Sequence, residues 1–316
     1  MPKAALRRSQ TINFARPKQQ IGSSVDGRGR IEHYVSVAFR CPHCLQSLAE
    51  QEAEFLCSAG HHFDRAKEGY VNLLPGGRLK SRPSGDDDSM VRARRRVFDA
   101  GLYDPVIGAV AALVAHSPVT NIVDAGCGEG SYLAAAATLS GAAGWGIDIS
   151  KPAIRLASRR HRTHRYAIAS SYALPFADNS FEALINVFSP RDFAEMLRVL
   201  APGGSAVVAT PGPRHLAQLK ALIYDGPRQH VDRSDPDTDA AAAADEPSPD
   251  HVSSVQFELS LDDQDLRLSL LEMTPFWWST TPERREVIAA TPLVVDIDIR
   301  LSVYRKPNGS APVQVL

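Results

Sequence analysis

The stretch of residues 122–130 restricts the fold more than any other part of this chain. It reads IVDAGCGEG: a short β-branched run ends in an acid, and glycines then alternate with other residues. The following residues, 131–139, are rich in alanine and leucine and favour a helix. A strand, a glycine turn and a helix in this order bring the backbone close to a nucleotide cofactor at the helix N-terminus. The pattern therefore predicts an α/β domain built around a nucleotide-binding turn.

The acidic residues around this turn favour one cofactor over another. Residues 144–149 read as the next strand, and Asp148 lies 148 − 128 = 20 residues after Gly128, where a ribose contact is expected. Asp148 alone does not distinguish NAD from S-adenosylmethionine. Carboxylates in the turn itself would repel a pyrophosphate but attract a sulfonium and an amino group. We therefore predict S-adenosylmethionine, held at the turn by Asp124, Gly126, Gly128, Glu129 and Gly130.

The rest of the chain alternates strands and helices in a way that predicts a doubly wound sheet. The length of 316 residues suits one large α/β domain and a small additional one. We expect a Rossmann-like methyltransferase with a mostly parallel sheet of seven strands. Beyond the first two strands, the predicted strands lie at 166–169, 181–188, 205–209, 255–260 and 293–304, and the predicted helices at 89–100, 106–115, 151–160, 192–200 and 261–271.

Three of the four cysteines fall in one short segment near the N-terminus. The spacing is C-x2-C, twelve intervening residues, and then C-x3-H. Two close ligand pairs separated by about a dozen residues are typical of a zinc ribbon, in which two turns present four ligands tetrahedrally. His43 and His62 are competing donors beside them. Because protein ligands fill all four positions, we expect a structural zinc ion. The predicted ligands are Cys41, Cys44, Cys57 and His61.

Composition and local sequence character predict the organisation of the chain. The net charge is −1, no apolar run approaches 18 residues, and four cysteines are too few for a disulfide scaffold. A cytoplasmic protein with reduced thiols and no membrane contact is expected. We predict a flexible basic tail at 1–36, the zinc ribbon at 37–74, a linker at 75–88, and the methyltransferase domain at 89–316 with an acidic, disordered insertion at 225–253.

The order of these motifs resembles that of one known family. The chain carries the ribbon, FDRAKEGYVNLL, DAGCGEG, NVFSPR and TPGPRHL in succession. The same succession is found in the RlmA family of bacterial 23S rRNA (guanine-N1)-methyltransferases, closely over residues 39–224 and more loosely beyond. The resemblance implies methylation of N1 of a guanine in a hairpin loop of domain II of the rRNA. It also implies zinc at the four ligands above and S-adenosylmethionine at the residues matching Tyr103, Gly128, Glu129 and His215.

The family has two branches, which modify neighbouring guanines of this hairpin. NVFSPR resembles the branch typical of Gram-positive bacteria, which includes a tylosin-resistance enzyme, whereas ATPGPRHL resembles the other branch. The composition, rich in alanine, arginine and aspartate, resembles that of a high-GC actinobacterium. We therefore expect the G748-type modification rather than the G745-type, and with it a link to antibiotic resistance.

The chemistry of guanine N1 suggests the remaining site residues. Neutral N1 keeps a proton and is a poor nucleophile, so an enzyme must remove that proton or stabilise the anion left on O6. We predict that Asn186 bonds the edge of the base and that Arg191 stabilises O6, and we assign no general base. His215 could be a base, but the resemblance places it at the cofactor. Ser171 would hold the adenine amino group, where many such enzymes have an acid.

Other interpretations stay open on the sequence alone. A small-molecule methyltransferase shares the catalytic fold, although it would not require an added ribbon. A non-catalytic zinc-ribbon RNA-binding protein is the third interpretation, and the intact glycine turn speaks against it. Arg92, Arg95 and Arg96 share one helix face, which would either grip phosphate or be solvated. A homodimer would suit a two-lobed grip on a hairpin, although no residue pattern shows one.

Overall fold

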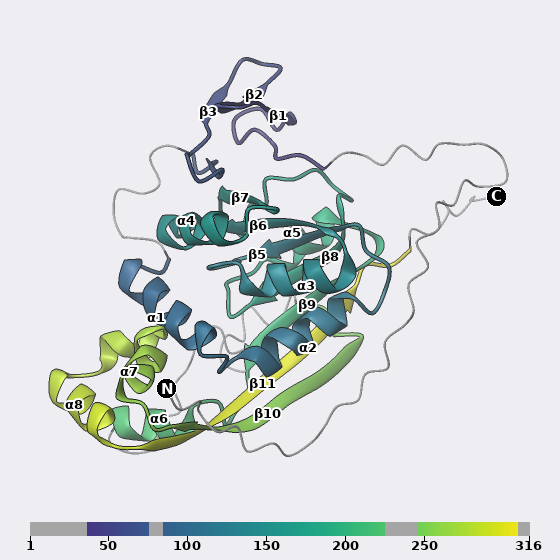
Figure 1. Ribbon diagram of the computed structural model, residues 1–316. Helices are drawn as coiled ribbons and strands as arrows, with labels where there is room; N and C mark the ends of the chain where they lie inside the picture. Colours follow the sequence, from purple (N-terminus) through teal and green to yellow (C-terminus); the bar gives the residue numbers. More distant parts are fainter. Residues whose placement is uncertain (1–36, 76–84, 225–245, 309–316) are drawn as a thin grey trace.

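The computed structural model describes residues 37–75, 85–224 and 246–308 (Figure 1). The predicted tail at 1–36 lies outside these ranges, as do most of the predicted linker and most of the predicted insertion. The first described segment forms a small antiparallel sheet in the order β1-β2-β3, at the top of Figure 1. Its strands are β1 (Leu48–Glu50), β2 (Glu54–Cys57) and β3 (His62–Asp64).

A second, larger sheet has the order β10-β11-β9-β8-β5-β6-β7-β4. The strands from β4 to β9 pair in parallel, while β11 runs antiparallel to β9 and to β10. The predicted mostly parallel sheet is confirmed, with one strand more than the expected seven. The additional strand, β4 (Val71–Asn72), comes from the end of the predicted ribbon. The others are β5 (Asn121–Ala125), β6 (Ala143–Asp148), β7 (Arg165–Ile168), β8 (Phe181–Val187), β9 (Leu200–Pro211), β10 (His251–Leu261) and β11 (Leu293–Arg305).

Helices cover one face of this sheet, and the ribbon shares the other face with a single short helix. Alternate strand residues divide between two cores: Ile122 and Ile185 face one, and Val123 and Leu184 face the other. The first core is covered by α1 (Asp88–Asp99), α2 (Asp104–Val114), α3 (Ser131–Ser140), α4 (Lys151–Arg160), α6 (Ala217–Ile223), α7 (Gln264–Glu272) and α8 (Pro282–Ala290). The second core is covered by α5 (Phe193–Val199) and the ribbon.

Aromatic packing joins the ribbon to the large sheet. The ring centroid of Phe39 lies 5.1 Å from that of Trp145 on β6 and 5.3 Å from that of Phe176. Phe176 in turn makes an edge contact with Phe181 on β8 at 4.8 Å. Buried aromatic pairs of this kind contribute about 0.5–1.5 kcal/mol each beyond their buried area. The ribbon and the sheet therefore share one core and are not two independently packed bodies.

Several element boundaries differ from the sequence prediction. Helix α8 was not predicted, although the Thr281 cap followed by a proline is a start signal. The helix predicted at 106–115 is α2, which begins two residues earlier, at Asp104, with Tyr103 as its N-cap. β10 begins at His251, so the predicted insertion of 225–253 extends too far at its end. Within the described ranges, no single helix is long and apolar enough to cross a membrane. The α1–α2 pair, bent by 86°, passes that test by length and composition only.

Candidate cofactor and zinc sites

The four predicted zinc ligands meet in the ribbon. Their ligand atoms all lie within 4.8 Å of one another. Cys44 Sγ lies 3.6 Å from Cys57 Sγ, and His61 Nδ1 lies 3.5 Å from Cys41 Sγ and 3.4 Å from Cys57 Sγ. With zinc bonds of about 2.3 Å to sulfur and about 2.0–2.1 Å to nitrogen, a tetrahedron has edges of about 3.5–3.8 Å. The donor set therefore fits zinc and leaves no position open for chemistry.

The two competing histidines lie outside this ligand set. His62 Nδ1 makes a 2.7 Å hydrogen bond to the Glu54 carboxylate, and the ring of His43 stacks on Phe63. Neither histidine belongs to the group of four ligand atoms, so the competition expected from the sequence is resolved in favour of His61. Burial alone would raise the pKa of Cys57, but hydrogen bonds from His61 outweigh it and lower the pKa to about 6. A lowered pKa favours the thiolate that zinc binds.

A cavity of about 420 Å³ opens at the carboxyl ends of the parallel strands. β5 lies between β6 and β8, so the strand order reverses beside it, which is where ligands bind in open α/β sheets. One half of the cavity is built by the glycine turn, by the ends of β6 and β7 and by α1. Residues of this half include Asp86, Arg94, Tyr103, Gly126, Gly128, Glu129, Asp148, Ser170, Ser171 and Tyr172.

Close packing explains why the turn requires glycine. Gly126, Gly128 and Gly130 all have positive φ, at +90°, +53° and +89°. A side chain on Gly126 would overlap Ser189, which follows β8, and one on Gly130 would meet the Tyr166 hydroxyl at 2.8 Å. The turn thus packs directly against the loop after β8, and the two together shape the cavity floor.

Carboxylates give this half of the cavity a negative character. Asp124 is buried, and its Oδ2 has no hydrogen-bond partner among the described residues. Burial raises the pKa of Asp124 well above its ordinary value, and the nearby Asp148 and Glu129 raise it further. Asp148 accepts hydrogen bonds from the N–H groups of Gly128 (2.9 Å) and Ser150 (2.8 Å). The raised pKa means that the ionised form of Asp124 lacks a compensating charge in this protein, so a cationic ligand, and not a pyrophosphate, would complement these acids.

The remaining predicted cofactor residues also reach the cavity. Tyr103 is buried beneath it and Ser171 lies on its rim. His215 stacks on Phe188, with ring centroids 6.0 Å apart and planes 11° apart. Burial, reinforced by the charge of Lys220, lowers the pKa of His215 to about 4, so the ring is neutral at pH 7. Seven of the nine predicted cofactor residues therefore line the cavity, and the other two, Asp124 and Gly130, belong to the glycine turn that forms part of it.

The two predicted catalytic residues lie elsewhere. Asn186 is buried and does not line the cavity; its amide donates to the Ala125 carbonyl at 2.8 Å, which ties the ends of β5 and β8 together. Arg191 turns away from the cavity, packs over the Phe193 ring and pairs with Glu246 at 3.5 Å. Neither side chain lines the cavity among the described residues, and their predicted contacts to a base stay predictions.

The arginine face of α1 serves the protein itself. Arg95 donates to the buried Glu129 carboxylate at 2.7 Å and pairs with Asp99. Arg96 donates to Ser269 at 2.7 Å on α7. Neither of the two interpretations left open for this face, phosphate contact or solvation, describes Arg95, whose charge compensates the carboxylate of the glycine turn. Arg94, which we did not single out, lines the cavity and pairs with Asp86.

Known proteins share both parts of the chain. The family model described as "RlmA, N-terminal" matches residues 39–82, and the one described as "Methyltransferase domain" matches residues 122–204. A provisionally named 23S rRNA (guanine-N(1)-)-methyltransferase of Micromonospora griseorubida is 36% identical over 294 residues, which cover 84% of this chain and 96% of that protein. Its provisionally named counterpart YxjB of Bacillus subtilis (strain 168) is 31% identical with the same coverage. The 23S rRNA (guanine(748)-N(1))-methyltransferase of Streptomyces fradiae is 38% identical, over 57% of this chain and 65% of that protein.

Proposed function

Because this chain belongs to the family of bacterial 23S rRNA (guanine-N1)-methyltransferases, we propose that it transfers a methyl group from S-adenosylmethionine to N1 of a guanine in 23S rRNA. The observation that carries the proposal is structural: a complete Cys3His zinc set lies on a ribbon that packs against one face of the sheet, and an acid-lined cavity opens at the switch point of the same sheet. A small-molecule methyltransferase would need the cavity but not the ribbon.

The residues of the turn suit the parts of the donor. We propose that Asp148 accepts the ribose hydroxyls, and that Asp124 and Glu129 offset the positive charge of the sulfonium and amino groups. Bound S-adenosylmethionine supplies the electrophilic methyl group. Tyr103 and Ser171 both line the cavity, and in this proposal Ser171 holds the adenine amino group. The peptide groups of Gly126, Gly128 and Gly130, together with His215, complete the proposed donor site.

We further propose that the modified base is the G748-type guanine and that the protein acts in the cytoplasm, where 23S rRNA is found. The support is the 38% identity to the Streptomyces fradiae enzyme, whose name gives position 748, and the NVFSPR motif at residues 186–191. Methylation there would link the enzyme to macrolide resistance, as the resemblance to the tylosin-resistance branch implies. Whether one copy or two copies bind the hairpin is a separate matter of assembly.

A direct assay tests the proposal. The zinc-loaded protein is incubated with labelled S-adenosylmethionine and unmodified 23S rRNA, and reverse-transcriptase stops are mapped in the domain II hairpin. A methyl group on N1 blocks base pairing, so we expect one strong stop. Asp148→Asn should abolish it, whereas Asp265→Asn, at an exposed position on α7, should not. Absence of both label and stop would contradict the proposal, and label in a small-molecule extract would favour the alternative.

A further inference from the structure

The half of the cavity opposite the glycine turn is built from three segments that are far apart in the sequence. They are residues 187–190 after β8, residues 211–220 at the end of β9 and in α6, and residues 273–276 at the start of the 3-10 helix η2 (Pro275–Ser279). Most of the side chains there are apolar or proline, and one of them, Lys220, carries a full positive charge. The donor proposal uses none of these residues except His215.

The exposure and the backbone conformation of Phe188 suit a residue that contacts a ligand. Its side chain lines the cavity and is 42% exposed, which is unusual for an aromatic ring beside a buried core. Its φ is +51°, a backbone conformation that costs a bulky residue about 1–2 kcal/mol. The Phe188 ring stacks on His215, and its exposed part borders the cavity, where a second planar group could contact it. Aromatic rings in such positions are the usual stacking partners of unpaired bases.

Lys220 places its charge on the same wall. Its Nζ lies 5.4 Å from the centroid of the Phe276 ring, and its charge contributes to the lowered pKa of His215. The rings of Phe276 and His215 both line the cavity, so the ammonium of Lys220 lies beside this half of it. A fixed cation in a largely apolar cavity stabilises an anion that develops during a reaction far more than it would in water.

We propose that this half is the acceptor subsite for a guanine, in which Phe188 stacks on the base and Lys220 stabilises the negative charge that O6 takes up when N1 loses its proton. The inference rests on the proposed rRNA N1 methylation. The N1 proton passes to water, the freed electron pair of N1 forms the new bond to the methyl carbon, and the carbon–sulfur bond breaks with its electron pair leaving on sulfur. The sum converts an N–H into an N–CH3 group and releases one proton.

His215 does not provide the base for this step. Its Nδ1 accepts a hydrogen bond from the Asp298 N–H at 3.4 Å, so the neutral ring carries its proton on Nε2. In the neutral ring, Nδ1 is occupied by this hydrogen bond and Nε2 already carries a proton. The pKa of about 4 also makes the ring a poor proton acceptor at pH 7. A cation that stabilises the anion, as opposed to a strong base, is what this cavity offers.

Three variants of the full-length, zinc-loaded protein test the inference: Lys220→Met, Lys220→Arg and Phe188→Leu. Lys306→Met is the matched control, because that lysine bonds Asn179 and the Leu200 carbonyl away from the cavity. We measure kcat and KM for 23S rRNA from pH 6 to 9, the affinity for S-adenosylmethionine by calorimetry, and thermal unfolding. Other charged and titratable groups lie around α6, and their contribution is common to all variants. Asp296 of β11 and Arg284 of α8 contact α6 at Gln218 and at the Ile223 carbonyl, and Asp298 of β11 acts on His215. The groups that line the cavity together with Lys220 are His215, Asp86, Arg94, Glu129 and Asp148.

We expect Lys220→Met to lower kcat at pH 7 by about 10- to 100-fold, the value of one charge-assisted interaction. The loss should shrink as the pH rises and hydroxide removes the N1 proton, and Lys220→Arg should recover most of the rate. Phe188→Leu should raise KM for rRNA by about 5- to 50-fold. All variants should bind S-adenosylmethionine like the parent protein.

Different results contradict the proposed function and the proposed acceptor subsite. A parent protein that binds S-adenosylmethionine but does not label 23S rRNA overturns the proposed function. An active parent protein whose Lys220→Met variant keeps kcat within twofold and an unchanged pH profile overturns the role of Lys220. An unchanged KM in a folded Phe188→Leu variant overturns the stacking role.

Discussion

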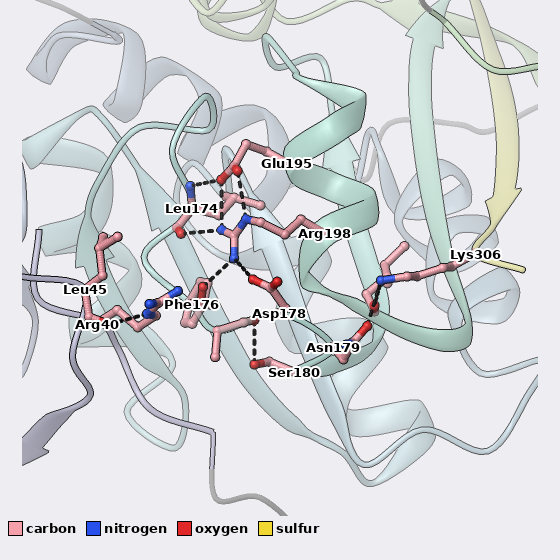
Figure 2. A network of polar contacts seen from close by, with 12 residues as sticks. Arg40, Leu45, Leu174, Phe176, Asp178, Asn179, Ser180, Glu195, Arg198 and Lys306 are labelled. Atoms are coloured by element: carbon pink, nitrogen blue, oxygen red, sulfur yellow. Dashed lines mark hydrogen bonds and ion pairs between the residues drawn. The ribbon is translucent and has the colours of Figure 1, made fainter. Parts of the chain in front are cut away.

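Replacement of Arg198 would show how firmly one loop joins the ribbon to the donor cavity. The Arg198 guanidinium donates to both oxygens of Glu195, at 2.8 and 2.9 Å, and to Asp178 at 2.8 Å (Figure 2). It also donates to the carbonyls of Phe176 and Leu174, at 2.8 and 3.0 Å. One side chain on α5 therefore fixes the last part of the loop between β7 and β8.

That loop contacts both functional parts of the protein. Its first residues, Ser171 and Tyr172, lie at the cavity that we assign to the donor. Its later residue Pro175 accepts a 2.8 Å hydrogen bond from the N–H of Arg40, at the first turn of the ribbon. Loss of Arg198 should therefore lower the stability of the whole fold and, to a smaller extent, the affinity for S-adenosylmethionine.

The burial of the Arg198–Glu195 ion pair sets the expected loss of stability. The Arg198 and Glu195 side chains are 26% and 23% exposed, so solvent screens the pair only in part. Breaking a fully buried pair costs about 3–5 kcal/mol, and we discount this to about 2–3 kcal/mol here. For a protein of this size, that corresponds to a decrease in Tm of roughly 4–12 °C. Arg198→Met keeps the length and packing of the side chain while it removes the charge.

The pH dependence gives a second and independent test. The hydrogen bond from Arg198 lowers the pKa of Glu195 below 4.5, although burial opposes it. A lowered folded-state pKa contributes stability that is complete above the unfolded value and disappears as the pH falls through the folded value. The Tm difference between the parent and Arg198→Met should therefore be largest at pH 6–7 and should shrink below about pH 4.5.

Differential scanning calorimetry of full-length protein measures both effects. Zinc content is determined at each pH, because protons compete for the ligands in both proteins. Arg162→Met is the matched control: Arg162 is exposed, its described bond is to the nearby Arg159 carbonyl, and its loss should change Tm by less than about 2 °C. If Arg198→Met melts within 2 °C of the parent at pH 7, or if its deficit persists unchanged at pH 3.5, the network does not have this role.

Three further predictions address the zinc and donor sites. Cys41→Ser should lower zinc content and rRNA methylation strongly, as mass spectrometry and the stop assay would show. Because the ribbon shares a core with the sheet, Tm should fall as well, while affinity for S-adenosylmethionine of the folded protein should largely survive. An equal collapse of cofactor binding would mean that the ribbon has no role in RNA binding beyond its contribution to the stability of the fold. Arg95→Met should leave the buried Glu129 carboxylate without its cation and destabilise the protein by about 3–5 kcal/mol in urea unfolding, and Arg95→Lys should recover part of this. Gly126→Ala should weaken S-adenosylmethionine binding at least tenfold in calorimetry because its side chain overlaps Ser189, and adding Ser189→Gly should restore part of the affinity.

Local patterns were sufficient for the features that depend on local geometry. The zinc ligands lie in two tight turns, so their spacing already specified which four atoms could meet. The glycine turn and Asp148 were equally accessible, because strand, turn and helix follow one another directly in a parallel α/β unit. Helix α8 could also have been found, since Thr281 and Pro282 give an ordinary start signal.

Residues that act through tertiary contacts were not accessible in this way. Arg92, Arg95 and Arg96 look alike on a helix face, and only the position of α7 and of the glycine turn makes Arg95 and Arg96 internal partners. Asn186 and Arg191 lie beside the expected site along the chain, yet the chain bends directly after β8, where Phe188 has φ +51°, and the two side chains reach other surroundings. The buried Asn186 amide joins the ends of β5 and β8, and the Arg191 guanidinium pairs with Glu246.

The same reasoning explains why the acceptor side of the cavity carries so little sequence signal. A donor site formed by one βα turn has its residues close together in the chain, whereas Phe188, Lys220 and Phe276 come from three separate segments. Each of them has an ordinary explanation when it is read alone, as a strand end, a helix cation and a packing aromatic. Only the folded protein brings them together on one wall of the cavity, while the carboxyl groups of Asp86, Glu129 and Asp148 line the other half. The proposed acceptor half is therefore apolar with one cation, and the proposed donor half is rich in acids. That separation of charge is what a transfer from a sulfonium to a deprotonated base requires.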